Sequence, residues 1–173
     1  MTSIQKMAAA IASLALIAGA SAASAQSYSF NQPAGTAVTA TGQLIQFVNY
    51  PGVEETVCNV QIFGTVGAGG ETIVFNSYNG VQAPGDDGNL ACGDSLNFPI
   101  EVTPASLSEI VLDEFIVGTR GGDCEEFDYA LAYNNTTGTA TFDGDWFGAS
   151  GICRAGGELA LRTNVGNNPV LIQ

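Results

Sequence analysis

The 173-residue sequence predicts one all-β domain, an antiparallel β-sandwich or barrel-like domain with two disulfides, which follows a cleaved signal peptide. Three observations support this fold class. Apolar and polar residues alternate in several short segments, which is the period of a strand with one buried face. Stretches rich in Gly, Asn and Pro separate these segments, and no stretch has a convincing helical pattern. Four cysteines complete the pattern of a small exported domain.

Residues 1–25 have the features of a signal peptide. Lys6 provides a positive charge, residues 8–20 are apolar, and Ala23-Ser24-Ala25 forms a small-residue cleavage site before Gln26. A membrane anchor is the weaker alternative, because the apolar run is too short to span a bilayer comfortably. We therefore expect a single domain over residues 26–173, secreted through the periplasm to the exterior, with no membrane-spanning segment after cleavage.

The expected strands are residues 36–48, 57–66, 71–78, 96–102, 108–119, 127–133, 139–147 and 152–162, and the tail 169–173 can add a last short strand. In the first of them, Val38, Ala40 and Leu44 share a face around Gly42. Residues 26–41 begin the domain as either an edge strand or an exchangeable N-terminal arm. The pair 57–66 and 71–78, joined by a Gly-rich loop, is the clearest hairpin.

Two middle segments contain residues that are atypical of a central strand. Residues 106–119 can contain one helical turn, with Ser106 as N-cap and Glu109 three residues later, but their content of Ile, Val and Phe favours a strand. Pro99 interrupts residues 96–102, and proline cannot donate to a sheet ladder. We therefore expect this strand at a sheet edge.

Residues 121–163 are predicted to form the closing β-meander. Phe127, Tyr129, Leu131 and Tyr133 alternate with polar residues and are predicted to share one face. In the same region, Leu159 and Leu161 share a face. We assign the aromatic residues of this region to the core rather than to a ligand platform; they are Phe127, Tyr129, Tyr133, Phe142, Trp146 and Phe147.

An even number of cysteines in an exported chain predicts disulfides, formed here by Cys58, Cys92, Cys124 and Cys153. Three connectivities are possible. We favour Cys58–Cys92 and Cys124–Cys153, because elements adjacent in sequence are usually adjacent in space. Each bond would contribute about 3 kcal/mol by restricting the unfolded chain. A zinc site is disfavoured because the chain has neither a CxxC spacing nor a histidine.

The composition argues against an enzyme. Without histidine there is no Ser-His or Cys-His nucleophile pair, and the only lysine, Lys6, leaves with the signal peptide. A pair of carboxylates for glycoside hydrolysis is expected by chance among 17 Asp and Glu residues, so it carries no weight. We assign no catalytic residue and no cofactor.

The strong negative charge limits the partners. Loss of Lys6 takes the net charge from −13 to −14, which repels nucleic acid and anionic headgroups. Ca²⁺ needs six to eight converging oxygen ligands. The acidic turns provide weak candidates at Asp86, Asp87, Asp143 and Asp145, none in a known calcium motif, so we assign no metal site.

Several segments together resemble one protein family. They are PAGTAVTATGQL (33–44), VCNVQIFGTVGAGG (57–70), GGDC (121–124), an F-x-G-x-W-F-G run (142–148) and GICRAGGELALRTNVGNNPVLI (151–172). The chain is similar in these segments to the PraB family of small exported bacterial proteins, described as alkane oxidation protein activators. The resemblance implies an extracellular, β-rich protein that promotes growth on long-chain alkanes by a non-enzymatic route, and it transfers no catalytic residue.

Three functions follow as hypotheses. The first is a secreted accessory protein that acts at the cell surface or at a hydrocarbon interface through exposed apolar surface. The second is a subunit of an extracellular filament or matrix, with residues 26–41 adding as a strand to a neighbouring copy. The third is a carbohydrate or calcium binding module that uses the acidic loops.

Overall fold

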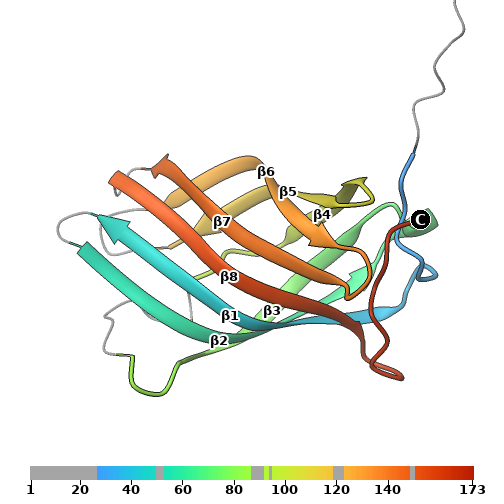
Figure 1. Cartoon of the computed structure of the whole chain (residues 1–173), viewed down its shortest axis with the longest axis horizontal. Helices are drawn as coiled ribbons and strands as arrows, with labels where there is room; N and C mark the ends of the chain where they lie inside the picture. The colour runs from blue at the N-terminus through green and yellow to red at the C-terminus, as the bar shows by residue number, and fades with distance from the viewer. Residues whose placement is uncertain (1–26, 50–52, 87–91, 94, 119–122, 149–150) are drawn as a thin grey trace, which may run out of the picture.

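A computed structural model describes residues 27–49, 53–86, 92–93, 95–118, 123–148 and 151–173. Within these residues, eight antiparallel strands form a closed barrel in which each strand pairs with the next and the last pairs with the first (Figure 1). They are β1 (Ala37–Asn49), β2 (Val53–Val66), β3 (Ile73–Gln82), β4 (Ile100–Ser106), β5 (Glu109–Val117), β6 (Cys124–Asn134), β7 (Thr139–Gly148) and β8 (Gly151–Thr163), with a short 3-10 helix, η1 (Ala68–Gly70), between β2 and β3. The all-β fold class is confirmed, in its barrel form.

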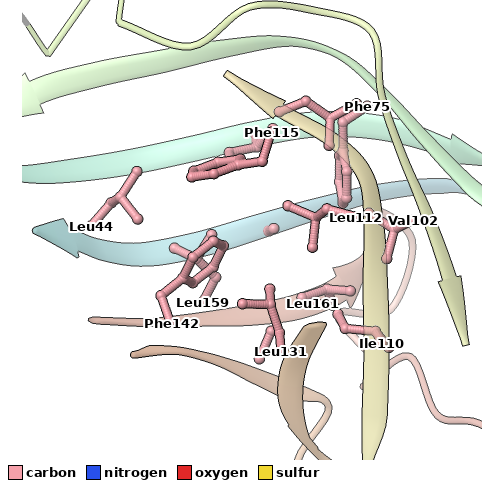
Figure 2. Close-up of a cluster of buried hydrophobic side chains, with 14 of the residues drawn as sticks. Leu44, Phe75, Val102, Ile110, Leu112, Phe115, Leu131, Phe142, Leu159 and Leu161 are labelled. Atoms are coloured by element: carbon pink, nitrogen blue, oxygen red, sulfur yellow. The ribbon is translucent and has the colours of Figure 1, made fainter. Parts of the chain in front are cut away.

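Alternate side chains fill the barrel, as a period of two requires. On β1 the buried residues include Val38, Ala40 and Leu44, and on β8 they include Leu159 and Leu161, as predicted. Leucine, isoleucine and phenylalanine side chains from the surrounding strands converge on the same interior (Figure 2). An eight-stranded barrel is just wide enough for side chains to fill its interior.

The barrel wall has two seams, by which we mean places where neighbouring strands pair over only a short length. The β3–β4 ladder is limited to residues 73–75 with 100–102, and the β6–β7 ladder to residues 132–134 with 139–141. The other ladders are longer; β1 and β2 pair from Ala37↔Thr65 to Asn49↔Val53. The barrel therefore consists of a three-stranded sheet, β4–β6, and a five-stranded sheet, β7–β8–β1–β2–β3, joined at the two seams.

Two disulfides lie beside these seams. Cys58 on β2 is bonded to Cys92, which follows β3, with a Cα–Cα distance of 5.6 Å. Cys124 at the start of β6 is bonded to Cys153 on β8, with a Cα–Cα distance of 6.0 Å. This is the pairing that sequence order favours. The second bond joins the two sheets directly, because β6 and β8 belong to different sheets.

Side chains and a short segment complete the β3–β4 seam. The backbone nitrogen of Ser95 donates to Tyr78 Oη at 2.6 Å, and Gln46 Nε2 donates to Ser95 Oγ at 2.7 Å. On its other side, Ser95 O accepts from the nitrogen of Gly118 at 2.7 Å. Residues 95–97 thus lie between β3 and the end of β5, and they take the place of a longer β4.

One end of the barrel is capped by the arm, residues 27–36, and the tail, residues 164–173, which lie together at the right of Figure 1. Phe30 is only 1% exposed and forms a bridge with Ile172. The tail is held from inside, since the Tyr133 hydroxyl donates to Val170 O. Burial raises the pKa of Tyr133 above the ordinary value for tyrosine. The expected last strand is reduced to single bridges at Pro169 and Ile172.

Two strand predictions are corrected. Residues 37–41, predicted within an edge strand or arm, belong to β1, which is paired with β2 on one side and β8 on the other. The strand predicted over 96–102 begins only at Ile100, after the cis peptide bond between Phe98 and Pro99, and continues to Ser106. It is not an edge strand, because the barrel is closed. For residues 109–117 the strand prediction, rather than the helical one, is confirmed.

The predicted face of β6 is wrong at one residue. Leu131 and Tyr133 are buried and Tyr129 packs against the core, but Phe127 is 61% exposed. Asp128 has a φ of 52°, in the left-handed region, and it has no partner in the β5–β6 register. After Asp128 the odd-numbered residues face the core, whereas before it the even-numbered residue Cys124 does, so Phe127 points outward. Of the other aromatic residues, Phe142 is buried, and the side chains of Trp146 and Phe147 lie outside the described part of the chain.

Candidate functional site

The barrel interior is a packed core. It contains an apolar cavity of about 30 Å³, lined by side chains from all eight described strands. One water molecule takes up about 30 Å³ of liquid, and ligand pockets measure roughly 300 Å³ or more. The interior as it stands therefore has no room for a hydrocarbon chain.

The structure describes three of the four weak calcium candidates, Asp86, Asp143 and Asp145. Asp86 accepts a hydrogen bond from Gln82 at 2.9 Å, and Asp87 lies outside the described residues. Asp145 forms an ion pair with Arg154, which lowers the pKa of its carboxyl. Among the residues that the structure describes, no three His, Cys, Asp or Glu side chains are grouped so that they would hold a metal ion.

Tyr129 fills the β6–β7 seam. A methyl group placed on Gly144 would lie 2.5 Å from Tyr129 Oη, so the tyrosine packs directly on the glycine backbone. Burial raises the pKa of Tyr129 to about 12. The negative charges of Asp143, Asp145 and Glu126 act in the same direction. Tyr129 is thus a neutral phenol at physiological pH that closes the wall of the barrel.

Charge is unevenly divided between the two sheets. Strands β4, β5 and β6 carry seven carboxylates and no basic residue, and we call this sheet the acidic wall. By contrast, β1, residues 57–66 of β2, and β3 carry no charged residue at all, and we call this part of the other sheet the charge-free wall. The barrel therefore presents surfaces of very different hydration.

The outer face of the charge-free wall mixes amide, hydroxyl and apolar side chains. Gln43 Nε2 donates to Asn59 Oδ1 at 3.2 Å, and Val81 is 64% exposed. A shallow groove of about 320 Å³ runs over the wall, lined by Thr41, Asn59, Val60, Gln61, Asn79 and Val81. Its volume is at the lower end of the ligand-pocket range, and every lining side chain is uncharged.

Other exposed apolar residues are dispersed. Apart from Val81, the large ones among the described residues are Leu107 in the β4–β5 turn, Phe127 on β6, Ile152 on β8 and Val165 in the tail. Single exposed apolar residues are ordinary in soluble domains. The charge-free wall is accordingly the most distinctive surface of the described barrel. The sequence alone did not reveal this wall, because the pairing of β1 with β2 beside the β2–β3 hairpin was needed to place the three strands together.

The disulfides and the comparisons bear on the setting of the protein. Two disulfides in one domain indicate an oxidising location outside the cytoplasm. In the described part of the chain, no helix has the length and apolarity to cross a membrane. A family model described as alkane oxidation protein activator PraA/PraB-like matches residues 1–166. Neither a curated protein nor a solved structure matches the chain.

Proposed function

The chain belongs to the PraA/PraB-like family of alkane oxidation protein activators, and we propose that it acts as a secreted, non-catalytic accessory protein at the cell surface or at a hydrocarbon–water interface. Residues 1–25 direct export as a signal peptide. A family named for activation fits an accessory rather than a catalytic role. The observation that carries the proposal is the unequal charge of the two walls.

The charge-free wall is the surface that meets the apolar phase, while the acidic wall remains in water. Three strands spaced 4.8 Å apart, each with about ten residues of 3.3 Å rise, cover roughly 500 Å². With about half of that area apolar, covering it would contribute about 6 kcal/mol. This is enough for adsorption of a folded barrel, provided that no charge has to leave water.

Charge placed on this wall should therefore prevent adsorption. Gln61 and Asn79 are opposite each other on β2 and β3. The variant Gln61→Glu/Asn79→Asp keeps the shape of both side chains and adds two carboxylates to the groove. Moving an ion out of water costs several kcal/mol, so two of them offset the whole gain estimated above.

The test compares hexadecane–water interfacial tension for protein purified from the medium or the periplasm. A control variant, Asn97→Asp/Ala130→Glu, adds the same charge at exposed positions beside or on the acidic wall. We expect the wild type and the control to lower the tension equally, and the charge-free-wall variant to lower it far less. Equal adsorption by both variants would refute the role of this wall. Growth on hexadecane, in cells whose own copy is deleted, should follow the same order.

A further inference from the structure

We propose that the arm, residues 27–36, also docks on the capped end of a second copy, so that the protein assembles head to tail by exchange of this arm. The occupant of the capped end is then the same segment from another molecule, and it makes the same contacts there. Such an exchange needs no unpaired strand edge, which the closed barrel does not offer.

The arm is bound only to the end of the barrel. Ser29 and Gln173 exchange two backbone hydrogen bonds, of 3.2 and 2.8 Å, and the Asn31 nitrogen donates to Leu171 O at 2.8 Å. The Phe30 nitrogen donates to Gly70 O at 2.7 Å, and its ring supplies the apolar anchor. Removing residues 27–32 breaks none of the eight barrel ladders, so the barrel can stay folded while the arm changes partner.

The connection from the arm to β1 has the features of a hinge. Gly35 has a φ of 83°, and a Cβ placed on it would meet no atom within 4 Å. Beside this turn lies a groove of about 500 Å³ between Pro33, Thr36, Val165 and Asn168, among others. The Gly35 nitrogen donates to Val66 O at 2.8 Å, so a change of φ and ψ here breaks one backbone hydrogen bond but meets no steric obstacle. The ten residues of the arm, fully extended, span about 33 Å, which is enough to reach a neighbouring molecule.

The lack of charged side chains at this end of the barrel favours it as the contact between two copies. Molecules that carry a net charge of −14 after loss of Lys6 repel one another over most of their surface. The arm, residues 27–36, and the tail, residues 164–173, contain no charged side chain. The contact is heterologous, because the arm of one copy meets the tail of the next. Repetition of a heterologous contact gives open chains unless the rotation closes a ring.

The experiment uses cysteines at the paired positions Ser29 and Gln173. A hydrogen-bonded antiparallel pair has a Cα–Cα distance near 5.5 Å, which suits a disulfide. Purified Ser29→Cys and Gln173→Cys proteins are mixed at high concentration and oxidised. We expect a covalent dimer on a non-reducing gel, well above the amount formed by a control mixture of Ser29→Cys with Val81→Cys. The double variant Ser29→Cys/Gln173→Cys locks each arm on its own barrel, and we expect it to elute only as monomer.

Two results would overturn the proposal. One is a locked double variant that assembles to the same sizes as the wild type. The other is a Ser29→Cys and Gln173→Cys mixture that yields no more covalent dimer than its control mixture. A wild type that stays monomeric at every concentration would accompany this second result. Neither result depends on adsorption to hexadecane, so the arm and the charge-free wall are tested separately.

Discussion

Removal of the Cys124–Cys153 disulfide, in the variant Cys124→Ala/Cys153→Ala, should destabilise the barrel by an amount that the structure lets us estimate. The bond joins residues separated by 29 positions. Restriction of the unfolded chain by such a loop is worth about 3.6 kcal/mol. In a domain of this size each kcal/mol moves Tm by about 2–4 °C, so Tm should fall by about 7–14 °C.

The bond at Cys58–Cys92 provides a matched comparison. Its loop spans 34 positions, and the same calculation gives about 3.8 kcal/mol. Chain entropy therefore predicts nearly equal losses for the two variants. Because each bond lies at a different seam, however, the two variants should show faster amide hydrogen exchange in different parts of the barrel. Without Cys124–Cys153, the amides of residues 124–129 should exchange faster, and without Cys58–Cys92 those of residues 78–82 and 95–97 should do so.

Urea denaturation and native-state hydrogen exchange test both parts. A loss below about 1 kcal/mol in the Cys124→Ala/Cys153→Ala variant would show that the unfolded chain is not restricted as calculated. If amide hydrogen exchange in either disulfide variant became faster by the same factor over the whole barrel, β1 and β2 included, the idea that each disulfide closes one seam would be refuted.

The β6–β7 seam and the neighbouring β7–β8 ladder give three further predictions. Gly144→Ala should lower the free energy of unfolding, measured by urea denaturation, by about 1–3 kcal/mol, because the new methyl group displaces Tyr129. The control Gly156→Ala should lower it much less, because the nearest atom to its new methyl group would be 3.6 Å away. Because the pKa of Tyr129 is raised, the contribution of this side chain to stability is fully present below pH 10 and is lost as the pH rises towards about 12. The variant Tyr129→Phe should therefore show a smaller fall in urea denaturation midpoint between pH 10 and about 12 than the wild type does. An equal fall in the two proteins would contradict the assignment. Asp145→Asn removes a surface ion pair with Arg154 in which both side chains are about half exposed, and it should leave Tm unchanged, since such pairs are screened by water and salt. A clear fall in Tm would mean that this pair stabilises the β7–β8 ladder.

Much of the fold follows from the period of the hydrophobic pattern. Alternation placed the strands around Val38, Leu44 and Leu159, because a strand with one buried face must repeat every two residues. The disulfide pairing followed from the proximity of successive elements. Phe127 could not be placed, because its outward direction depends on the left-handed conformation of Asp128, which residues with a Cβ seldom adopt.

The candidate site was less accessible to sequence analysis. The absence of charge from residues 37–49 and 73–82 is visible in the printed sequence, as is the run of carboxylates in residues 109–128. Their assignment to two opposed walls required the strand order and the positions of the seams. The length of a ladder depends on how neighbouring strands diverge in space, and a one-dimensional pattern carries no information on that divergence.

The pairing of β1 with β8 has a consequence for the timing of folding. Val38 pairs with Thr163, so the first strand waits for a partner 125 residues later in the chain. Chains emerge from synthesis N-terminus first, and such distant pairings make folding slow. The β1–β2 hairpin can form early, but its other side stays unpaired until nearly the whole chain has been made. Because each disulfide joins cysteines that are consecutive in the sequence, both can form during this interval, before the ring closes.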